Sequence, residues 1–388
     1  KSNDTIINSQ KKHKNEEKEI DKFHKFAIID TNGDIYEINK KNWRSCKIFN
    51  NPQEKYNLLK IFVRNEFEGK PKKDSKPKHI DHMKTLELLD YCPESDVGHM
   101  KWYPNGTLIK DLIMDYALKN IALKTGSMKI QNPLLYRTDV KEINQLQGEF
   151  HERDYLIEDE NKSLVLRFAS DPGAFPFAQK LSFSYKNTPV RLYEEAICFR
   201  KEQKGELTGL MRLRNFWMTD QHVFCKNETE GKNEFLVLSK LFSELMTEVI
   251  AGNHWVVGFE LVEEHYEKYI EIIRQTVIDS KSPALIKIMK EMSHYYSFKS
   301  EYQAIFADES NLQISTVQWD TKNGERFNIK YMNEQGKKVP ISTIIHASSF
   351  GSIERSIAAI LETALWEEKS GLNPVLPVWL APEHVRLI

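Results

Sequence analysis

The stretch from Ala196 to Phe224 constrains the fold more strongly than any other part of the sequence. Its pattern predicts two β-strands joined by a Gly-containing turn at Lys204 to Gly209. Because strand side chains alternate between two faces, the even-numbered residues are expected to share one face. That face carries Arg200, Glu202, Arg212, Arg214, Phe216, Met218, Asp220 and His222. Its guanidiniums and its flat aromatic ring suit a polyanion with a stackable base, such as a nucleoside triphosphate.

The overall charge gives no sign of general attraction to nucleic acid or to membranes. The 388 residues include 55 Lys and Arg against 56 Asp and Glu, so any contact with RNA must be local. Four cysteines lie far apart without CxxC spacing, which favours a reducing compartment, and we expect a cytoplasmic protein. No apolar run approaches the roughly 20 residues of a membrane span, and the Lys-rich start lacks the apolar core of a signal peptide.

A small N-terminal unit is expected to precede a large one. Residues 1–22 are polar and charged without apolar periodicity, so we expect a linker or a disordered segment. Two apolar runs around Asn-Gly-Asp predict a hairpin over residues 26–38, and a helix is expected around 56–66. A Pro- and Lys-rich linker at 69–79 would end this small α/β connector, which spans residues 23–79.

The rest of the chain predicts strands and helices that are grouped rather than regularly alternating. We expect loops at 96–104 and 170–177, helices at 107–124, 233–251 and within 261–292, and strands at 128–136 (broken by Pro133), 155–158, 164–169, 296–306, 313–320 and 339–347. This distribution predicts an α+β fold with an antiparallel β-sheet flanked by helices, not alternating βαβ units. Neither GxGxxG nor GxxxxGK[ST] occurs, which excludes the two common phosphate-binding loops.

The last predicted strand leads directly into a helix with the sequence GSIERSIAAILE. Gly351 permits a tight turn at the start of this helix, and Arg355 is expected to face the sheet from its first turn. A guanidinium fixed by a packed helix can neutralise a polyphosphate with defined geometry. Alone, the segment would rather suggest a surface helix with an ordinary Glu–Arg pair, but beside the hairpin we favour phosphate binding.

Three segments resemble the ordered motifs of the class II aminoacyl-tRNA synthetases. The predicted helix, strand and Pro133 resemble motif 1, FRKE at 199–202 with Arg212 resembles motif 2, and GSIER at 351–355 resembles motif 3. Within the class, SDVGHMKWYPNG, GELTGLMRLRNFWMTDQHVFC and IHASSFGSIER resemble the archaeal type of threonyl-tRNA synthetase. The resemblance implies a class II catalytic domain over 80–374, with 375–388 as the start of a truncated anticodon-binding domain.

The resemblance also implies an ATP site. Arg200 and Arg355 would be catalytic: Arg200 would hold the α-phosphate, where charge develops as the threonine carboxylate attacks, and Arg355 the γ-phosphate. Glu202 would position the adenine, and Phe216 would stack on it with Arg355 on the other side. Further contacts to phosphate, ribose or adenylate would come from Arg212 and Gln318, with Mg²⁺ on the phosphates.

For the amino acid, the resemblance implies a zinc ion bound by one Cys and two His. His222 and His346 match the histidines, but Asp171 stands at the cysteine position. A carboxylate binds zinc at about the distance of an imidazole, so an Asp-His-His site is feasible, although its metal preference is less thiolate-driven. Asp220 matches the acceptor for the threonine hydroxyl, and Tyr296 matches a tyrosine near the amino group.

The implied activity is that of a threonine–tRNA ligase. It would activate L-threonine with ATP to threonyl-adenylate and transfer it to the 3′-end of tRNA(Thr), as a homodimer formed through motif 1. Asp171 keeps a second hypothesis open, a non-catalytic or weakly catalytic paralogue that binds tRNA or a partner and supports editing. Judged without the family, Asp171 fits a turn, His222 a structural histidine and Tyr296 a packing residue.

Overall fold

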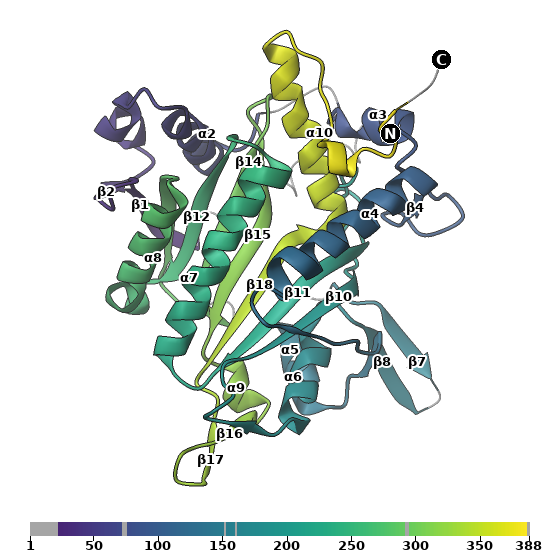
Figure 1. The fold of residues 1–388 in the computed structure, drawn as a ribbon, viewed down its shortest axis with the longest axis vertical. Coiled ribbons are helices and arrows are strands. Elements are labelled where there is room, and N and C mark those ends of the chain that lie inside the picture. Colours follow the sequence, from purple (N-terminus) through teal and green to yellow (C-terminus); the bar gives the residue numbers. More distant parts are fainter. Residues whose placement is uncertain (1–21, 72–75, 151–152, 160, 292–294, 386–388) are drawn as a thin grey trace, which may run out of the picture.

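One large β-sheet organises the computed structural model, which describes residues 22–71, 76–150, 153–159, 161–291 and 295–385 (Figure 1). Its strand order is β2-β1-β13-β12-β14-β15-β18-β11-β10-β5. The pairs β12–β13 and β10–β5 run parallel, and the other neighbouring pairs run antiparallel. The strands are β1 (Phe23–Ile29), β2 (Ile35–Ile38), β5 (Met128–Lys129), β10 (Val190–Phe199), β11 (Asn215–Cys225), β12 (Trp255–Val262), β13 (Ala284–Met289), β14 (Tyr296–Ile305), β15 (Asn311–Asp320) and β18 (Thr343–Ser352).

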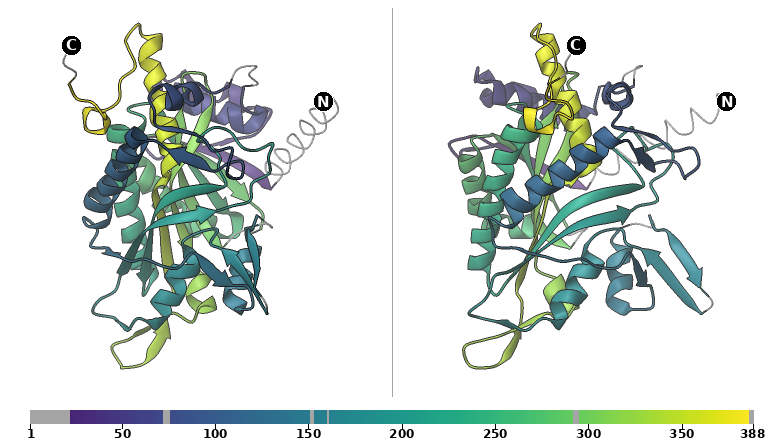
Figure 2. Two further views of the ribbon diagram at one scale, coloured as in Figure 1. Left: turned by 90° about the vertical axis from the view of Figure 1, so that its right-hand side faces the viewer. Right: turned by 45° about the vertical axis from the view of Figure 1, so that its right-hand side comes forward.

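Helices cover one face of this sheet and only the two ends of the other. The covered face packs against α4 (Pro104–Ala117), α7 (Glu228–Leu245), α8 (Tyr266–Ser280) and α10 (Ile353–Lys369) in one large apolar core, as Figure 2 shows from two sides. On the second face, α2 (Glu54–Glu68) packs near β12 and β13, whereas α5 (Lys141–Gly148) and α6 (Asp171–Lys180) pack near β10 and β11. The strip between these two apolar clusters carries the polar side chains that form the candidate site.

The remaining elements are short. The hairpin β3 (Leu89–Tyr91) and β4 (Met100–Trp102), the sheet β6 (Leu135–Arg137), β8 (Lys162–Leu166) and β7 (Leu156–Asp159), and the sheet β17 (Lys338–Pro340), β16 (Lys330–Met332) and β9 (Phe183–Ser184) surround the large sheet, with α3 (His79–Thr85) and α9 (Asn323–Arg326). Short 3-10 turns lie at Trp43–Ser45, Lys47–Asn50, Glu263–His265 and Val378–Leu380, and π-turns at Leu118–Ala122 and Met246–Ile250 extend α4 and α7. Within the described ranges, no helix has the length and apolar character needed to cross a membrane.

Several predicted elements are present. The α+β class is confirmed, and the first predicted hairpin is β1–β2, where Asp30 accepts the backbone N–H groups of Asn32 and Asp34, both at 2.9 Å. The helices expected at 56–66 and 233–251 are α2 and α7 with its π-turn. The strand that Pro133 was expected to break is divided, because β5 joins the large sheet and β6 joins a smaller one.

The helical prediction for residues 261–292 is wrong at both ends. The chain there forms β12, α8 and β13, and β12 pairs with β13 in parallel, so the fold contains one βαβ unit after all. All six residues of β13 are buried. A short strand that is buried on both faces has no alternating pattern, so periodicity cannot separate it from a helix.

Two predicted loops also contain regular structure. Residues 96–104 include β4, and residues 170–177 lie mainly in α6. Pro172 occupies the first turn of α6, where a proline costs no hydrogen bond. The buried ring of Phe175 anchors this helix in an apolar cluster. The Asp-Pro-Gly sequence predicted a turn because tertiary packing of the helix cannot be seen from these local residues.

The strands of the opening hairpin are shorter than predicted. β10 ends at Phe199 and β11 begins at Asn215, so Arg200, Glu202 and Arg212 lie in a long loop instead of on strands. Hydrogen bonds between loop residues replace the ladder, including Arg212 Nε to Glu202 Oε2 at 3.2 Å. The shared face is observed further along, where Phe216 lies opposite Cys198 and Asp220 lies opposite Glu194.

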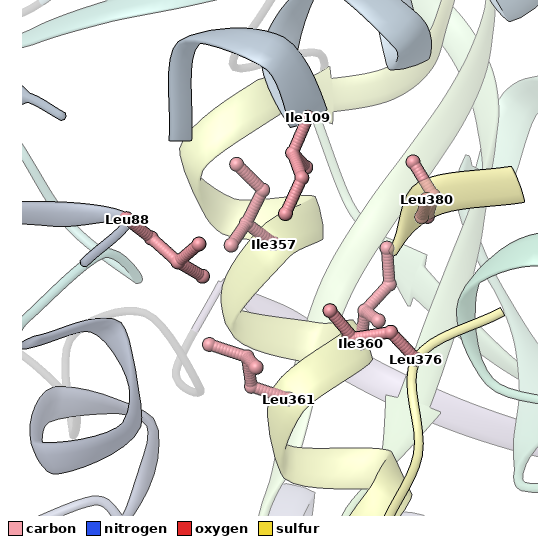
Figure 3. A pocket seen from close by; sticks show the side chains of 7 residues that line it. All are labelled: Leu88, Ile109, Ile357, Ile360, Leu361, Leu376 and Leu380. Atoms are coloured by element: carbon pink, nitrogen blue, oxygen red, sulfur yellow. The ribbon is translucent and has the colours of Figure 1, made fainter. Parts of the chain in front are cut away.

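Two of the predicted segments lie at the ends of the chain. Residues 1–21, the main part of the predicted linker, lie outside the described residues. At the other end, residues 375–385 contain the 3-10 turn Val378–Leu380 and no strand. Leu376 and Leu380 instead pack over α4 and α10 and close an apolar cavity of about 10 Å³ (Figure 3). A cavity of that size and lining is expected to be dry.

Candidate active site

Cross-strand register gathers the predicted site residues on the uncovered strip of the sheet. His222 lies opposite His346, and His346 lies opposite Gln318. One step along, Asp220 lies opposite Ser348. Directly paired residues point to the same face, so β11, β18 and β15 form a continuous polar surface. Cys225 belongs to the apolar core on the other face, as expected from its odd position.

Arg200 is held at one end of this surface by backbone and rings. Its Nε donates to the carbonyl of Phe168 at 2.9 Å. Its guanidinium lies over the rings of Phe150 and Phe216, at 5.2 Å and 5.3 Å from their centroids. The ring of Phe216 therefore faces Arg200. These contacts use the planar, stackable character of a guanidinium and leave its terminal nitrogens for an anion.

The loop between β10 and β11 holds a compact ionic group. Glu202 is buried, and its Oε2 accepts from Arg212 and from Arg153. Glu206 adds a second carboxylate, 3.3 Å from Arg153 and 3.8 Å from Arg212. Arg153 had not been predicted, because it lies far from the hairpin in sequence and only folding brings it to Glu202.

Arg355 extends from the first turn of α10 toward the same loop. The N-cap Ser352 accepts its backbone N–H at 3.1 Å, and Arg355 Nε donates to the carbonyl of Met211 at 3.1 Å. Burial, and then the proximity of Arg212 and Arg200, lowers the pKa of Arg355 to about 10. The side chain stays charged at neutral pH, and mutual repulsion of three guanidiniums favours a bound polyanion.

A tyrosine other than the predicted one lies beside the histidines. The hydroxyl of Tyr296 donates to Glu260 Oε2 at 2.9 Å, away from the histidines, and its ring belongs to the apolar cluster that packs against α2. Tyr295 instead packs against His346, with ring centroids 4.9 Å apart, and donates to Gln318 Oε1 at 2.8 Å. Adjacent residues project in different directions, so the two neighbouring tyrosines have different surroundings.

Asp220 lies on the same polar surface, two residues before His222 on β11. Its Oδ2 accepts from the hydroxyl of Ser170 at 2.6 Å, a contact that was not predicted. Burial raises the pKa of Asp220 above its ordinary value. The carboxylate is thus a buried acceptor whose environment favours additional hydrogen-bond donors or positive charge.

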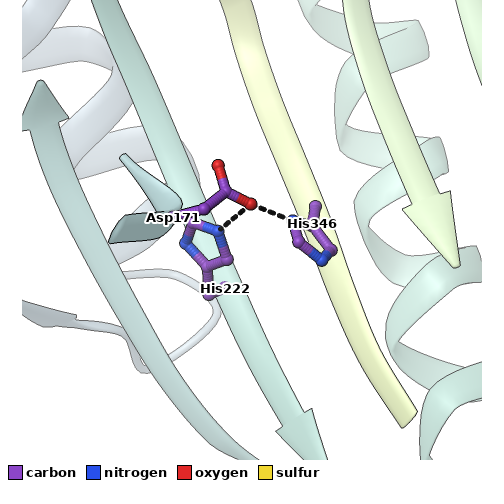
Figure 4. Close-up of side chains that lie close together, drawn as sticks. All are labelled: Asp171, His222 and His346. Atoms are coloured by element: carbon purple, nitrogen blue, oxygen red, sulfur yellow. Dashed lines mark ion pairs between the residues drawn. The ribbon is translucent and has the colours of Figure 1, made fainter. Parts of the chain in front are cut away.

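Asp171, His222 and His346 converge in one buried cluster (Figure 4). Asp171 Oδ1 lies 3.6 Å from His222 Nε2 and 3.2 Å from His346 Nδ1. The edge of Phe175 contacts both imidazole rings, which fixes their orientation from α6. Burial alone would raise the pKa of Asp171. The neighbouring histidines nevertheless hold this pKa well below its ordinary value.

The cluster fits a tetrahedral metal ion. Zinc bonds of about 2.0–2.1 Å place two ligand atoms roughly 3.4 Å apart, close to the 3.6 Å and 3.2 Å that separate Asp171 from the two histidines. Asp171 Oδ1 and His222 Nε2 are also buried and make no hydrogen bond. Buried polar atoms need a partner, and an ion between them would provide one.

Comparison of the sequence with known protein families gives one match over more than half of the chain. Residues 155–364 match the family model described as the tRNA synthetase class II core domain (G, H, P, S and T). The chain belongs to this family. The predicted class II fold is confirmed.

Curated relatives narrow the resemblance within the class. The chain is 36% identical to the threonine–tRNA ligase of Methanosarcina mazei over 335 residues, and 33% identical to that of Methanosphaera stadtmanae over 367 residues. These alignments cover 86% and 94% of the chain but 52% and 57% of the relatives. The chain therefore spans about half the length of the curated relatives it matches.

Solved structures support the fold. A structure of Cryptosporidium parvum threonyl-tRNA synthetase, titled as its RNA binding domain, superposes with a TM-score of 0.67 at 22% identity, covering 80% of this chain and 75% of that one. Prolyl-tRNA synthetase of Giardia lamblia, in complex with prolyl-adenylate, gives a TM-score of 0.59 at 17% identity, covering 79% and 55%.

Asp320 is a further carboxylate beside the Asp-His-His cluster, and the sequence did not predict it. Its Oδ2 lies 2.9 Å from His346 Nε2 and also accepts from the side chain of Asn323 at 2.7 Å. His346 Nε2 thus bonds to Asp320 while Nδ1 faces Asp171. The signal was available, since Asp320 follows Gln318 by two positions on β15 and so shares its face.

Changing Asp320 to asparagine is expected to lower zinc affinity by about 10–100-fold, because carboxylates that orient metal-binding histidines contribute that much. Competition titration against a chromophoric chelator measures this affinity. Asp159→Asn makes the same chemical change at an exposed position of β7, far from the histidines in the fold, and serves as the control. Equal zinc affinity in wild type and Asp320→Asn would contradict the role of Asp320.

Glu354 should make the stability of the folded chain depend on pH. Its carboxylate is buried and accepts the backbone N–H of Trp217 at 3.2 Å. Burial raises its pKa from 4.5 to about 8. Between these values the folded chain keeps a proton that the unfolded chain has released, so the free energy of unfolding should fall as pH rises through this window.

Glu354→Gln is expected to reduce that slope, since glutamine does not ionise. Urea unfolding at several pH values within the window measures the slope for both proteins. A slope that is the same with glutamine would show that Glu354 is already ionised in the folded state.

Proposed function

We propose that this chain is the catalytic core of a threonine–tRNA ligase. It would join L-threonine to ATP as threonyl-adenylate and then transfer the threonyl group to the 3′-end of tRNA(Thr). The observation that carries the proposal is the adjacency of two sites on one sheet surface. Three guanidiniums from the loop and α10 stand at one end, and Asp220 with the Asp-His-His cluster stands at the other. The homologous threonine–tRNA ligases support the amino-acid assignment.

The residues of the chain would promote the activation step by positioning and electrostatics, with Mg²⁺ on the phosphates. A carboxylate oxygen of threonine attacks the α-phosphorus of ATP, and the bond to the leaving pyrophosphate breaks. The attacking carboxylate is already ionised at neutral pH, so no general base is needed. Arg200 would hold the α-phosphate and Arg355 the γ-phosphate, with Arg212 on the remaining phosphate oxygens. Fixed cations at these points stabilise the charge that develops in the transition state.

For amino-acid selection, we propose that Asp220 accepts from the threonine hydroxyl and that Tyr295, rather than Tyr296, lies near the amino group. A zinc ion held by Asp171, His222 and His346 would bind the amino group and hydroxyl and so exclude valine, which lacks the hydroxyl. With valine bound, Asp220 would also lack the hydroxyl that donates to it, and a buried carboxylate left without a donor is costly. Serine lacks only a methyl group, worth roughly 1–3 kcal/mol, so its rejection should be weak.

The carboxylate at position 171 supports a second candidate function. Without a thiolate, the cluster has lower intrinsic preference for zinc. If the metal is not bound, the chain would be a weakly catalytic paralogue that keeps tRNA or partner binding. Threonine-dependent exchange of radioactive pyrophosphate into ATP, with metal analysis of the same sample, separates the two. No exchange at saturating threonine and zinc would overturn the ligase proposal.

A homodimer is proposed through the motif 1 region. Apolar side chains that are 40–55% exposed lie on β5 to β7 and near Pro133: Met128, Leu134, Leu135 and Leu156. Exposed apolar side chains on these segments are available to pack against a partner subunit. Sedimentation analysis would contradict the proposal if the wild-type chain were monomeric at micromolar concentration.

The proposed domains are the connector over 23–79, the catalytic domain over 80–374 and the start of an anticodon-binding domain over 375–388. The family match lies within the second of these. β1 and β2 of the connector hydrogen-bond into the large sheet, so the connector should fold together with the catalytic domain. Release of residues 23–79 as a separately folded proteolytic fragment would contradict this.

The proposed compartment is the cytoplasm. All four cysteines are free, and Cys198 and Cys225 are buried. Free thiols are typical of reducing compartments. A disulfide found in protein isolated from its natural source would count against this placement.

A further inference from the structure

A completely buried histidine connects three parts of the chain around the ATP-binding loop. His79 is the first residue of α3 and is 0% exposed. Its backbone N–H and its Nδ1 both lie 2.8 Å from Glu362 Oε1 on α10. Its Nε2 lies 3.1 Å from the backbone nitrogen of Leu210, in the loop that carries Arg212. One imidazole therefore joins α3, the motif 3 helix and the motif 2 loop.

These contacts fix the protonation of the ring. The backbone N–H of Leu210 can only donate, so Nε2 of His79 must be the unprotonated acceptor. A neutral imidazole carries its proton on the other nitrogen, so Nδ1 donates to Glu362. Both ring nitrogens are satisfied in one tautomer, and a protonated ring would break the bond to the loop.

The loop backbone is shaped for this close contact. Gly209 has a φ of +47°, and a Cβ added there would lie 2.2 Å from His79 Nε2. Met211 follows Leu210 in the chain, and its backbone carbonyl accepts a hydrogen bond from Arg355 Nε at 3.1 Å. The loop is thus attached at two neighbouring residues, to His79 and to Arg355, immediately before Arg212.

We propose that His79 is a positioning residue for ATP: it holds the motif 2 loop so that Arg212 and Glu202 face the nucleotide. The inference rests on the proposed function. His79 does not touch the substrate, and it acts through the backbone of Leu210. Its position at the end of the predicted linker also means that the placement of α3 sets the placement of the loop. A side chain that merely filled space would act on stability alone.

Two amide variants separate the hydrogen bond to the loop from the hydrogen bond to Glu362. In His79→Gln, the amide oxygen can reach the position of Nε2 and accept from Leu210. In His79→Asn, the shorter amide can replace Nδ1 toward Glu362 but cannot reach the loop. Losing one hydrogen bond of this kind should raise the KM for ATP by about 3–10-fold in the asparagine variant. In the asparagine variant, the KM for threonine should stay near the wild-type value. In the glutamine variant, both KM values should stay near those of the wild type.

Met83→Ala is the stability control, because Met83 is a buried residue of the same helix without a contact to the loop hydrogen bond. Pyrophosphate exchange provides both KM values. Trypsin cleavage at the exposed Lys204 reports on the loop and should be faster only in the asparagine variant. Nitrogen NMR of labelled histidine should show that Nε2 of His79 is unprotonated and that the proton on Nδ1 exchanges slowly.

The outcomes distinguish this inference from the proposed function. Absence of exchange in the wild type would overturn the ligase proposal, and ATP calorimetry, trypsin cleavage and NMR would still test His79. Parallel changes of both KM values in all three variants would show a role in stability alone and overturn the inference. An ATP affinity that is unchanged in His79→Asn, or a proton on Nε2, would overturn it as well.

Discussion

Arg200→Ala is expected to slow threonine-dependent pyrophosphate exchange by about 10²–10³-fold, the loss typical of removing one preorganised donor for transition-state charge. Arg200 is preorganised by the carbonyl of Phe168 and by the rings of Phe150 and Phe216. The effect should fall mainly on kcat, since the charge on the α-phosphate grows during the reaction. Arg200→Lys should recover little, because an ammonium cannot stack and bridge two oxygens.

Arg137→Ala is the matched control for this measurement. Arg137 is an exposed arginine on β6 that pairs with Asp139, and its loss should leave exchange unchanged. A kcat of Arg200→Ala within about twofold of wild type would be far from the expected decrease of about 10²–10³-fold. That result would show that the guanidinium does not act on the reacting phosphate.

Asp171→Ala is expected to reduce zinc affinity by more than the roughly 10–100-fold that loss of a histidine-orienting group costs, because it removes a direct ligand. Two histidines alone hold the ion with fewer bonds and without a negative charge. Asp171→Cys should raise zinc affinity above wild type, since a thiolate is the softer ligand. Metal content after dialysis and competition titration measure both changes.

Asp220→Asn provides the control for the metal experiments. Asp220 bonds to Ser170 instead of the histidines, so its loss should spare zinc binding while impairing the use of threonine. Unchanged zinc stoichiometry and affinity in Asp171→Cys would count against Asp171 as a ligand. Loss of zinc without loss of threonine activation would show that the ion is structural.

Local patterns in the sequence determined the class of fold and much of the site. Alternation on β11 placed Asp220 and His222 on one face, because strand geometry depends only on neighbouring residues. The ordered motifs identified the family around Arg200 and Arg355, and the family model matches the region that contains both. Turn residues likewise predicted the β1–β2 hairpin.

Tertiary structure alone decided contacts between distant segments. Tertiary packing pairs β12 with β13 and makes the segment after Ser170 helical. It also places Tyr295 beside His346, and no local pattern records these contacts. The same holds for Asp320 beside His346 and for His79 beside Leu210. A sequence specifies which face a side chain occupies through the period of its own strand or helix. Which side chain it meets depends on strand register and helix docking, and these are set by burial across the whole core.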